Sequence, residues 1–233
     1  MLRVVCSVSD RDNWTLRPYA YLMGKYWSEQ QPVVVAGYTK PDFDLPANFT
    51  FHSIDIYNYP ANKWSDGVLK FFSEFTDEHF VWTYSDFWLR RTVNHAAIGI
   101  LHDYAMDHPE VYRIDLGTDR LFSHDNRYMA DYARWGCLNI IQSNPDWPYH
   151  HSTQAGLFRR EKFIQLLKPG WTPWQFELEG ASLLAEHPDW LVLGTRQIPV
   201  DYIHSMVSGS ASPILEGIEP EHVAYMSEQG WLP

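Results

Sequence analysis

The sequence contains only two cysteines, Cys6 and Cys137, which lie far apart along its 233 residues. Two distant thiols exclude a disulfide framework and a thiolate zinc cluster, so we expect both to be reduced. The sequence also lacks any apolar run approaching the roughly 18 residues that cross a bilayer, and its first ten residues contain no signal-peptide core. These absences predict a cytoplasmic protein with no membrane span.

Basic residues are in short supply. The chain has 18 Lys and Arg against 29 Asp and Glu, which gives a net charge of −11 with His neutral. Because nucleic acids and anionic membranes bind proteins largely through positive charge, this balance excludes a protein whose main task is to coat either of them. A local basic groove remains compatible with it.

Several catalytic motifs are absent as well. The sequence has no glycine-rich phosphate-binding loop, no dinucleotide fingerprint, no nucleophile elbow of the serine hydrolases and no HExxH zinc motif. ATPases, dehydrogenases, serine hydrolases and zinc proteases are therefore disfavoured.

Aromatic side chains, in contrast, are abundant, since 11 Trp, 14 Tyr and 12 Phe make up 16% of the chain. This is more than the filling of a core requires, and flat side chains also line sites for sugars and bases. Trp64, Trp88 and Trp174 accompany acidic residues at the ends of expected strands or helices. We expect these three rings at a ligand site.

Apolar runs alternate with helical patterns through the first half of the chain. Strands are predicted at 4–8, 32–39, 49–56 and 79–86. The second half predicts strands near 110–116, 138–142 and 190–206, and helices near 157–168 and 173–186. Such alternation favours an α/β fold with a mixed, mostly parallel sheet flanked by helices, and since no linker divides the chain we expect one domain over residues 1–233.

One acidic residue stands at the end of a predicted buried strand. Asp86 follows the run at 79–86, and ligands of open α/β sheets bind beyond the carboxyl ends of the strands. A carboxylate fixed there suits a divalent metal held against phosphate oxygens. The ordinary alternative is an Asp that caps the next turn.

A second acidic residue opens a predicted helix. Thr172, with Gln175 three residues later and a proline between them, forms a capping box, so Trp174 and Glu177 share one face of the first turns. Glu177 could take a proton from an acceptor hydroxyl while the indole stacks on a sugar or base. The alternative is a solvated Glu beside a core Trp.

Other polar groups give weaker signals. Asp115 and Asp119 form an acidic pair in a loop, and His204 is an isolated histidine in a late strand. Solvated loop acids and a packed histidine are the ordinary interpretations, and the residues alone favour them.

Three segments, taken in order, resemble those of a known family. They are Trp64-Ser65-Asp66, the strand end Ser85-Asp86-Phe87-Trp88-Leu89, and STQAGLFRREKFIQLLKPGWTPWQFE from Ser152 to Glu177. Together they resemble glycosyltransferases of the GT-A type, with the nucleotide-diphospho-sugar transferase fold, in their compact bacterial and phage forms. The likeness covers most of the chain, and its third segment is the most specific.

The resemblance implies transfer of a sugar from a nucleotide diphosphate donor such as a UDP-sugar. It implies two segments near the nucleotide, Ser7, Asp10 and Arg11 after the first strand, and Trp64, Ser65 and Asp66. The acceptor stays open among a glycan, a small molecule and modified DNA.

The resemblance also implies a divalent metal, Mn or Mg. Asp86 matches the second acid of the metal-binding pair, Ser85 replaces the first acid, and His204 takes the place of a late metal-binding histidine. Glu177 matches the acid that serves as the base in inverting members. Gln154 and Trp174 then lie around the donor sugar or the acceptor.

Two alternatives accompany this hypothesis. One is a phage-type enzyme that glycosylates hydroxymethylated bases in DNA, where aromatic rings could stack on a flipped base, although the net charge of −11 opposes duplex binding. The other is a non-catalytic module that binds a sugar nucleotide or a glycan, which the replacement of an acid by Ser85 favours.

Overall fold

The computed structural model describes residues 2–117, 129–147, 149–206 and 213–233. One large sheet contains strands β1 Arg3–Ser7, β2 Val33–Gly37, β3 Phe49–Ser53, β4 His79–Tyr84, β6 Val111–Asp115, β7 Met129–Trp135, β8 Leu138–Ser143, β9 Gly156–Arg159 and β10 Leu191–Thr195. A small sheet pairs β5 Phe87–Leu89 with β11 Tyr202–His204. The α-helices are α1 Leu16–Leu22, α2 Trp64–Glu74, α3 His95–Asp107, α4 Arg160–Leu166, α5 Pro173–Leu184 and α6 Pro220–Glu228. Shorter helical turns are η1 Asp10–Thr15, η2 Met23–Trp27 and η3 Ala61–Lys63.

The large sheet has the strand order β3-β2-β1-β4-β9-β6-β10-β8-β7. Strands β8 and β9 run antiparallel to their neighbours, and the other seven strands point in one direction. This arrangement confirms the mixed, mostly parallel sheet flanked by helices that the sequence predicts.

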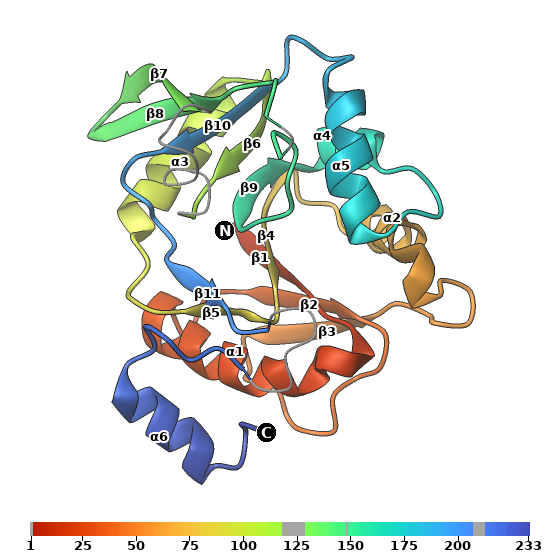
Figure 1. Ribbon diagram of the computed structural model, residues 1–233, viewed down its shortest axis with the longest axis vertical. Helices are drawn as coiled ribbons and strands as arrows, with labels where there is room; N and C mark the ends of the chain where they lie inside the picture. The colour runs from red at the N-terminus through yellow and green to blue at the C-terminus, as the bar shows by residue number, and fades with distance from the viewer. Residues whose placement is uncertain (1, 118–128, 148, 207–212) are drawn as a thin grey trace.

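Helices cover both faces of this sheet (Figure 1). Side chains alternate between the faces along each strand, so Val4 and Cys6 of β1 pack with α1 and α3, whereas Val5 packs with α2, α4 and α5. Strand β2 is buried along its whole length, as expected for a strand covered on both faces. No helix in the described ranges is both long and apolar enough to span a bilayer.

One expected helix begins later than the sequence suggests. Residues 157–159, which we expect at the start of a helix, belong to β9, and α4 begins at Arg160. The apolar run there fits a strand buried between β4 and β6, with which it pairs on both edges. Those pairings join residues far apart in the chain, so helical periodicity over 157–168 does not reveal them.

A buried histidine lies at the end of β4 remote from Asp86. His79 is 4% exposed, and within the described residues neither of its ring nitrogens has a hydrogen-bond partner. Its ring contacts that of His102 edge-on at 5.3 Å. Burial lowers the pKa of His79 to about 4, and the nearby charge of Arg159 adds to the shift. His79 is therefore neutral in the folded protein at neutral pH.

His79 makes the protein less stable in mild acid. Its pKa is lower folded than unfolded, so the unfolded chain binds the proton first, and stability is lost as the pH falls from about 6.5 towards about 4. We expect His79→Phe, which keeps a ring in the same place, to reduce the loss of unfolding free energy between pH 7 and pH 5 by about 1–2 kcal/mol. Urea unfolding at the two pH values measures it, with His187→Phe on a half-exposed histidine as the control. If His79→Phe lost as much unfolding free energy between pH 7 and pH 5 as the wild type, His79 would not be the cause of the destabilisation in acid.

Candidate active site

The carboxyl ends of three strands meet at one edge of the large sheet. Ser7 ends β1 and is paired in register with Tyr84 at the end of β4, while Asp115 ends β6. The backbone N–H of Ser85 donates to the Ser7 carbonyl at 3.2 Å, which ties the two strand ends together. Ligands of open α/β sheets bind at such an edge, so the polar side chains around it are candidates for a functional site.

Asp86 lies in the tight turn between β4 and β5. Its backbone carbonyl accepts a hydrogen bond from the N–H of Ser205 at 2.8 Å, just after β11. In the β5–β11 pairing His204 lies opposite Phe87, and the two rings are 4.6 Å apart. The structure thus brings His204 to within one register position of Asp86, with its ring against Phe87.

The electrostatic setting of Asp86 favours a bound cation. Burial raises the pKa of its carboxyl to about 6, the charge of Asp12 raises it further, and Arg11 opposes the shift. A poorly solvated carboxylate gains from a divalent cation, for which carboxylate oxygens are the preferred ligands. Asp86 therefore suits a metal on chemical grounds, and the β5–β11 pairing brings the histidine His204 beside its turn.

Ser85, which replaces the expected first acid, faces the interior. Its side chain is 3% exposed, and its hydroxyl oxygen accepts a hydrogen bond from Thr15 at 2.7 Å. The Trp88 indole N–H donates to the Ser85 carbonyl at 3.1 Å. Ser85 thus connects η1 to the β4–β5 turn. A carboxylate in its place would be buried beside the Thr15 hydroxyl.

Residues of η1 cover the same edge. Both oxygens of Asp10 bind Thr39 in the loop after β2, one its backbone N–H at 2.9 Å and the other its hydroxyl at 2.8 Å. Arg11 donates to Asp12 at 3.0 Å and keeps a largely exposed side chain. The positive charge of Arg11 favours the ionised form of Asp86 and so lowers its pKa, against the effect of burial.

Glu177 reaches the edge from α5. The capping box at Thr172 and Gln175 is confirmed and fixes the start of this helix. One oxygen of Glu177 accepts hydrogen bonds from Thr153, which immediately precedes Gln154 in the segment leading into β9. Burial raises the pKa of the Tyr84 hydroxyl, and the charges of Glu177 and, to a lesser extent, Asp86 raise it further. Both carboxylates are therefore near one buried phenol.

Gln154 connects this site to β11. Its side-chain oxygen accepts a hydrogen bond from the Tyr202 hydroxyl at 2.5 Å, and its carbonyl accepts one from Arg113 at 3.0 Å. Arg113 is a fully buried residue of β6, so its hydrogen bond fixes the backbone of Gln154 to the sheet.

The segment Trp64-Ser65-Asp66 is engaged elsewhere. Trp64 is 7% exposed and packs against the rings of Trp82 and Phe176. The Ser65 hydroxyl accepts from the Trp171 N–H at 2.8 Å, and Asp66 accepts from the Gly170 N–H at 2.7 Å. These contacts join the start of α2 to the loop before α5, so the segment helps to place α5.

The three tryptophans expected at a ligand site have different environments. Trp64 is nearly buried and Trp88 is fully buried, so our expectation is wrong in placing them as accessible rings. Trp174 is 68% exposed at the start of α5. Helix α2 and strand β5 each need a large ring for packing, which explains the burial of the first two.

Sequence reasoning assigned Asp115 to a loop and missed Thr153, and both residues lie at this edge. Asp115 is 3% exposed at the end of β6, 3.5 Å from Arg113, and accepts from the Gly117 N–H at 3.2 Å. Its place at the end of the predicted strand 110–116 was the available signal, whereas Asp119 lies outside the described residues. Thr153 had no comparable signal, because only the folded chain brings it to Glu177.

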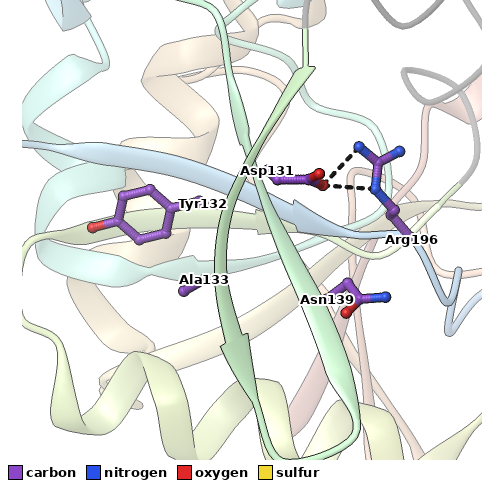
Figure 2. Close-up of a pocket in the computed structure, with 5 residues that line it drawn as sticks. All are labelled: Asp131, Tyr132, Ala133, Asn139 and Arg196. Carbon is purple, nitrogen blue, oxygen red and sulfur yellow. Dashed lines mark hydrogen bonds and ion pairs between the residues drawn. The ribbon is translucent and has the colours of Figure 1, made fainter.

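Two shallow surface hollows lie outside this cluster of acids. One, of about 440 Å³, is lined by η1, the loop at 39–43 and Gly230–Trp231. The other, of about 370 Å³, lies on the β7–β8 hairpin, where Arg196 donates to Asp131 at 2.9 and 2.8 Å beside Tyr132 and Asn139 (Figure 2). Neither hollow is lined by Asp86 or Glu177.

Among the described residues, one group of three metal-ligating side chains has its ligand atoms within 4.8 Å of one another. It consists of Glu219, Glu221 and His222 at the start of α6. The His222 ring also shares a hydrogen bond of 2.9 Å with the Tyr21 hydroxyl, and it packs edge-on against the Tyr21 and Tyr26 rings. These contacts attach α6 to α1 and η2.

Comparisons with known proteins complete the description. No protein-family model matches the sequence, and no curated protein matches it. The chain is similar to the solved galactosyltransferase LgtC in complex with donor and acceptor sugar analogues, with 12% identity, a TM-score of 0.42, and coverage of 82% of this chain and 67% of LgtC. An active-site mutant of LgtC matches at 11% identity with the same TM-score and coverage. The bifunctional glycosyltransferase WbbM matches at 12% identity and a TM-score of 0.44, over 77% of this chain and 37% of its own length.

Proposed function

We propose that this protein is a glycosyltransferase that moves a sugar from a nucleotide diphosphate donor, a UDP-sugar, to an acceptor hydroxyl with inversion at the sugar carbon. The observation that carries the proposal is the convergence of two acids from separate elements on one sheet edge. Asp86 follows β4 and Glu177 comes from α5, and the charges of both act on the Tyr84 hydroxyl. Two carboxylates in different surroundings are typical of active sites in which one acid binds the electrophile and the other acts as the base.

Each residue has a distinct part in this proposal. Asp86, with His204 beside it, would hold a Mn or Mg ion at the diphosphate end of the donor, and Ser7, Asp10 and Arg11 border the nucleotide. A divalent ion supplies charge that stabilises the departing diphosphate. Arg11 adds positive charge at the same place, as its exposed guanidinium can turn towards a phosphate.

Glu177 acts as the base. It takes the proton of the acceptor hydroxyl as that oxygen bonds to the sugar carbon, and the bond from this carbon to the diphosphate oxygen breaks. Gln154 borders the donor sugar, and Trp174 provides an exposed indole for the acceptor. Trp64, Ser65 and Asp66 support the site by fixing the loop before α5.

The test of this proposal is a nucleotide-release assay. The protein is incubated with UDP-glucose, UDP-galactose and UDP-N-acetylglucosamine, with Mn or Mg or with a chelator, and with glycan, small-molecule and hydroxymethylated-DNA acceptors. We expect UDP release that depends on one donor and falls in chelator. Donor binding in calorimetry without any release would support a non-catalytic module instead, and absence of both would contradict the proposal.

The indole of Trp174 gives a prediction on acceptor binding. Because the ring is 68% exposed, Trp174→Ala should leave the melting temperature unchanged. Loss of a stacking surface should raise the acceptor KM about fivefold or more with little change in kcat. Steady-state kinetics at saturating donor measures this, and Leu178→Ala, which removes a half-exposed side chain one turn later, is the matched control. An unchanged acceptor KM would exclude Trp174 from the acceptor site.

A further inference from the structure

The carboxylate of Glu177 is held by one of its two oxygens. Its Oε1 accepts a hydrogen bond from the Thr153 backbone N–H at 2.6 Å and a second from the Thr153 hydroxyl at 2.9 Å. Within the described parts of the chain, Oε2 has no hydrogen-bond partner. Two donors on one oxygen fix the orientation of the group and leave the other oxygen available to a substrate.

A third group extends this arrangement into the sheet. The Tyr84 hydroxyl lies 3.0 Å from the hydroxyl oxygen of Thr153. The single proton of Thr153 is directed to Glu177, since an ionised carboxylate only accepts, and Tyr84 must therefore donate to Thr153. The result is a chain of hydrogen bonds with one direction, from Tyr84 through Thr153 to Glu177, in which each bond polarises the next.

The middle residue of this chain is firmly placed. Thr153 is 4% exposed, and Gln154 beside it is fixed through Tyr202 on one side and Arg113 on the other. Tyr84 is part of β4 and Glu177 part of α5, so the chain connects a central strand, the segment before β9 and a surface helix. An oriented carboxylate needs support of this kind, since a base displaced by about 1 Å can lose most of its effect.

We propose that Thr153 and Tyr84 are positioning residues for the base, which hold Oε1 of Glu177 so that Oε2 faces the acceptor hydroxyl. The inference rests on the proposed function and adds two residues to it. When the acceptor oxygen attacks, its proton passes to Oε2, and the two hydrogen bonds at Oε1 are kept before and after the transfer. Neither Thr153 nor Tyr84 gains or loses a proton in this step.

Three substitutions test the arrangement. Thr153→Val removes the hydroxyl, keeps the side-chain shape and leaves the backbone N–H in place, and it should lower kcat about 10- to 100-fold with the donor KM unchanged. Thr153→Ser restores the hydroxyl and should recover kcat to within about threefold of the wild type. Tyr84→Phe removes only the first hydroxyl of the hydrogen-bond chain and should lower kcat about three- to tenfold. Thr50→Val, at an exposed threonine on β3, is the matched control.

The outcomes separate this inference from the proposed function. If the wild type releases no nucleotide with any donor, the proposed function fails and the positioning role fails with it. If the wild type is active, either of two results overturns the positioning role alone. One is a kcat of Thr153→Val equal to that of the wild type, and the other is a kcat of Thr153→Ser as low as that of Thr153→Val. A crystal structure of Thr153→Val is the second readout, in which we expect the Glu177 carboxylate to turn away from its wild-type orientation, and an unturned carboxylate also overturns it.

Discussion

Glu177→Gln is expected to lower kcat for sugar transfer by about 10²- to 10⁴-fold, because an amide cannot accept the proton of the acceptor hydroxyl. The amide oxygen can still accept both hydrogen bonds from Thr153, so the fold around α5 should be kept. Donor affinity, measured by calorimetry, should therefore stay within about threefold of the wild type, since the lost group acts on the acceptor. Single-turnover kinetics with saturating donor and acceptor measures the loss.

Glu179→Gln is the matched control for this substitution. It makes the same chemical change two residues later on the same helix, at an exposed position directed away from Thr153. Its kcat should equal that of the wild type. If Glu177→Gln and Glu179→Gln had the same activity, Glu177 would not be the base, although the site could still bind a donor.

Asp86→Asn is expected to change stability and donor binding in opposite directions. The carboxyl of Asp86 has a pKa of about 6 in the folded protein, raised mainly by burial from an unfolded value of 3.8. A raised pKa means that ionised Asp86 opposes folding, so its unfavourable contribution appears as the pH rises from about 4 through about 6. The neutral amide should then increase the free energy of unfolding near pH 7.5 by about 1–3 kcal/mol, with little difference at pH 4.

The same substitution should weaken metal-dependent donor binding. An amide cannot supply the charged oxygen that a divalent cation and the diphosphate require, so calorimetry with UDP and Mn should show at least about a tenfold weaker affinity. Asp103→Asn, which removes an exposed acid of α3, is the control and should change neither property. A variant of Asp86 that is no more stable at neutral pH and binds UDP normally would remove Asp86 from the proposed site.

Local features of the site were predictable from the sequence. The capping box from Thr172 to Gln175 requires only four consecutive positions, and it correctly predicted where α5 begins and that Glu177 lies in its first turns. The place of Asp86 beyond a buried strand followed equally from a short apolar run. In both cases the signal and the structure it predicts lie within one segment.

Contacts between distant segments were beyond such reasoning. The hydrogen bonds of Thr153 join residues 69 and 24 positions away, and no spacing in the sequence reports them. Trp64 shows the converse, because its neighbours in sequence are polar while its contacts, Trp82 and Phe176, come from β4 and α5. An aromatic ring beside acids is therefore a weak sign of a ligand site when the fold can cover that ring.

The antiparallel direction of β9 determines which residues lie at this edge of the sheet. Since β9 runs against β4 and β6, Trp82 is paired with Gly156 and Asp115 is paired with that same residue, so the residues that precede β9 arrive where those two strands end. Strand β9 has only four residues, and a slip of one position would exchange Thr153 for Ser152 or Gln154 beside Glu177. Evolutionary selection on the sequence of β9 would thus act on the chemistry of the site, although none of its four residues belongs to the site.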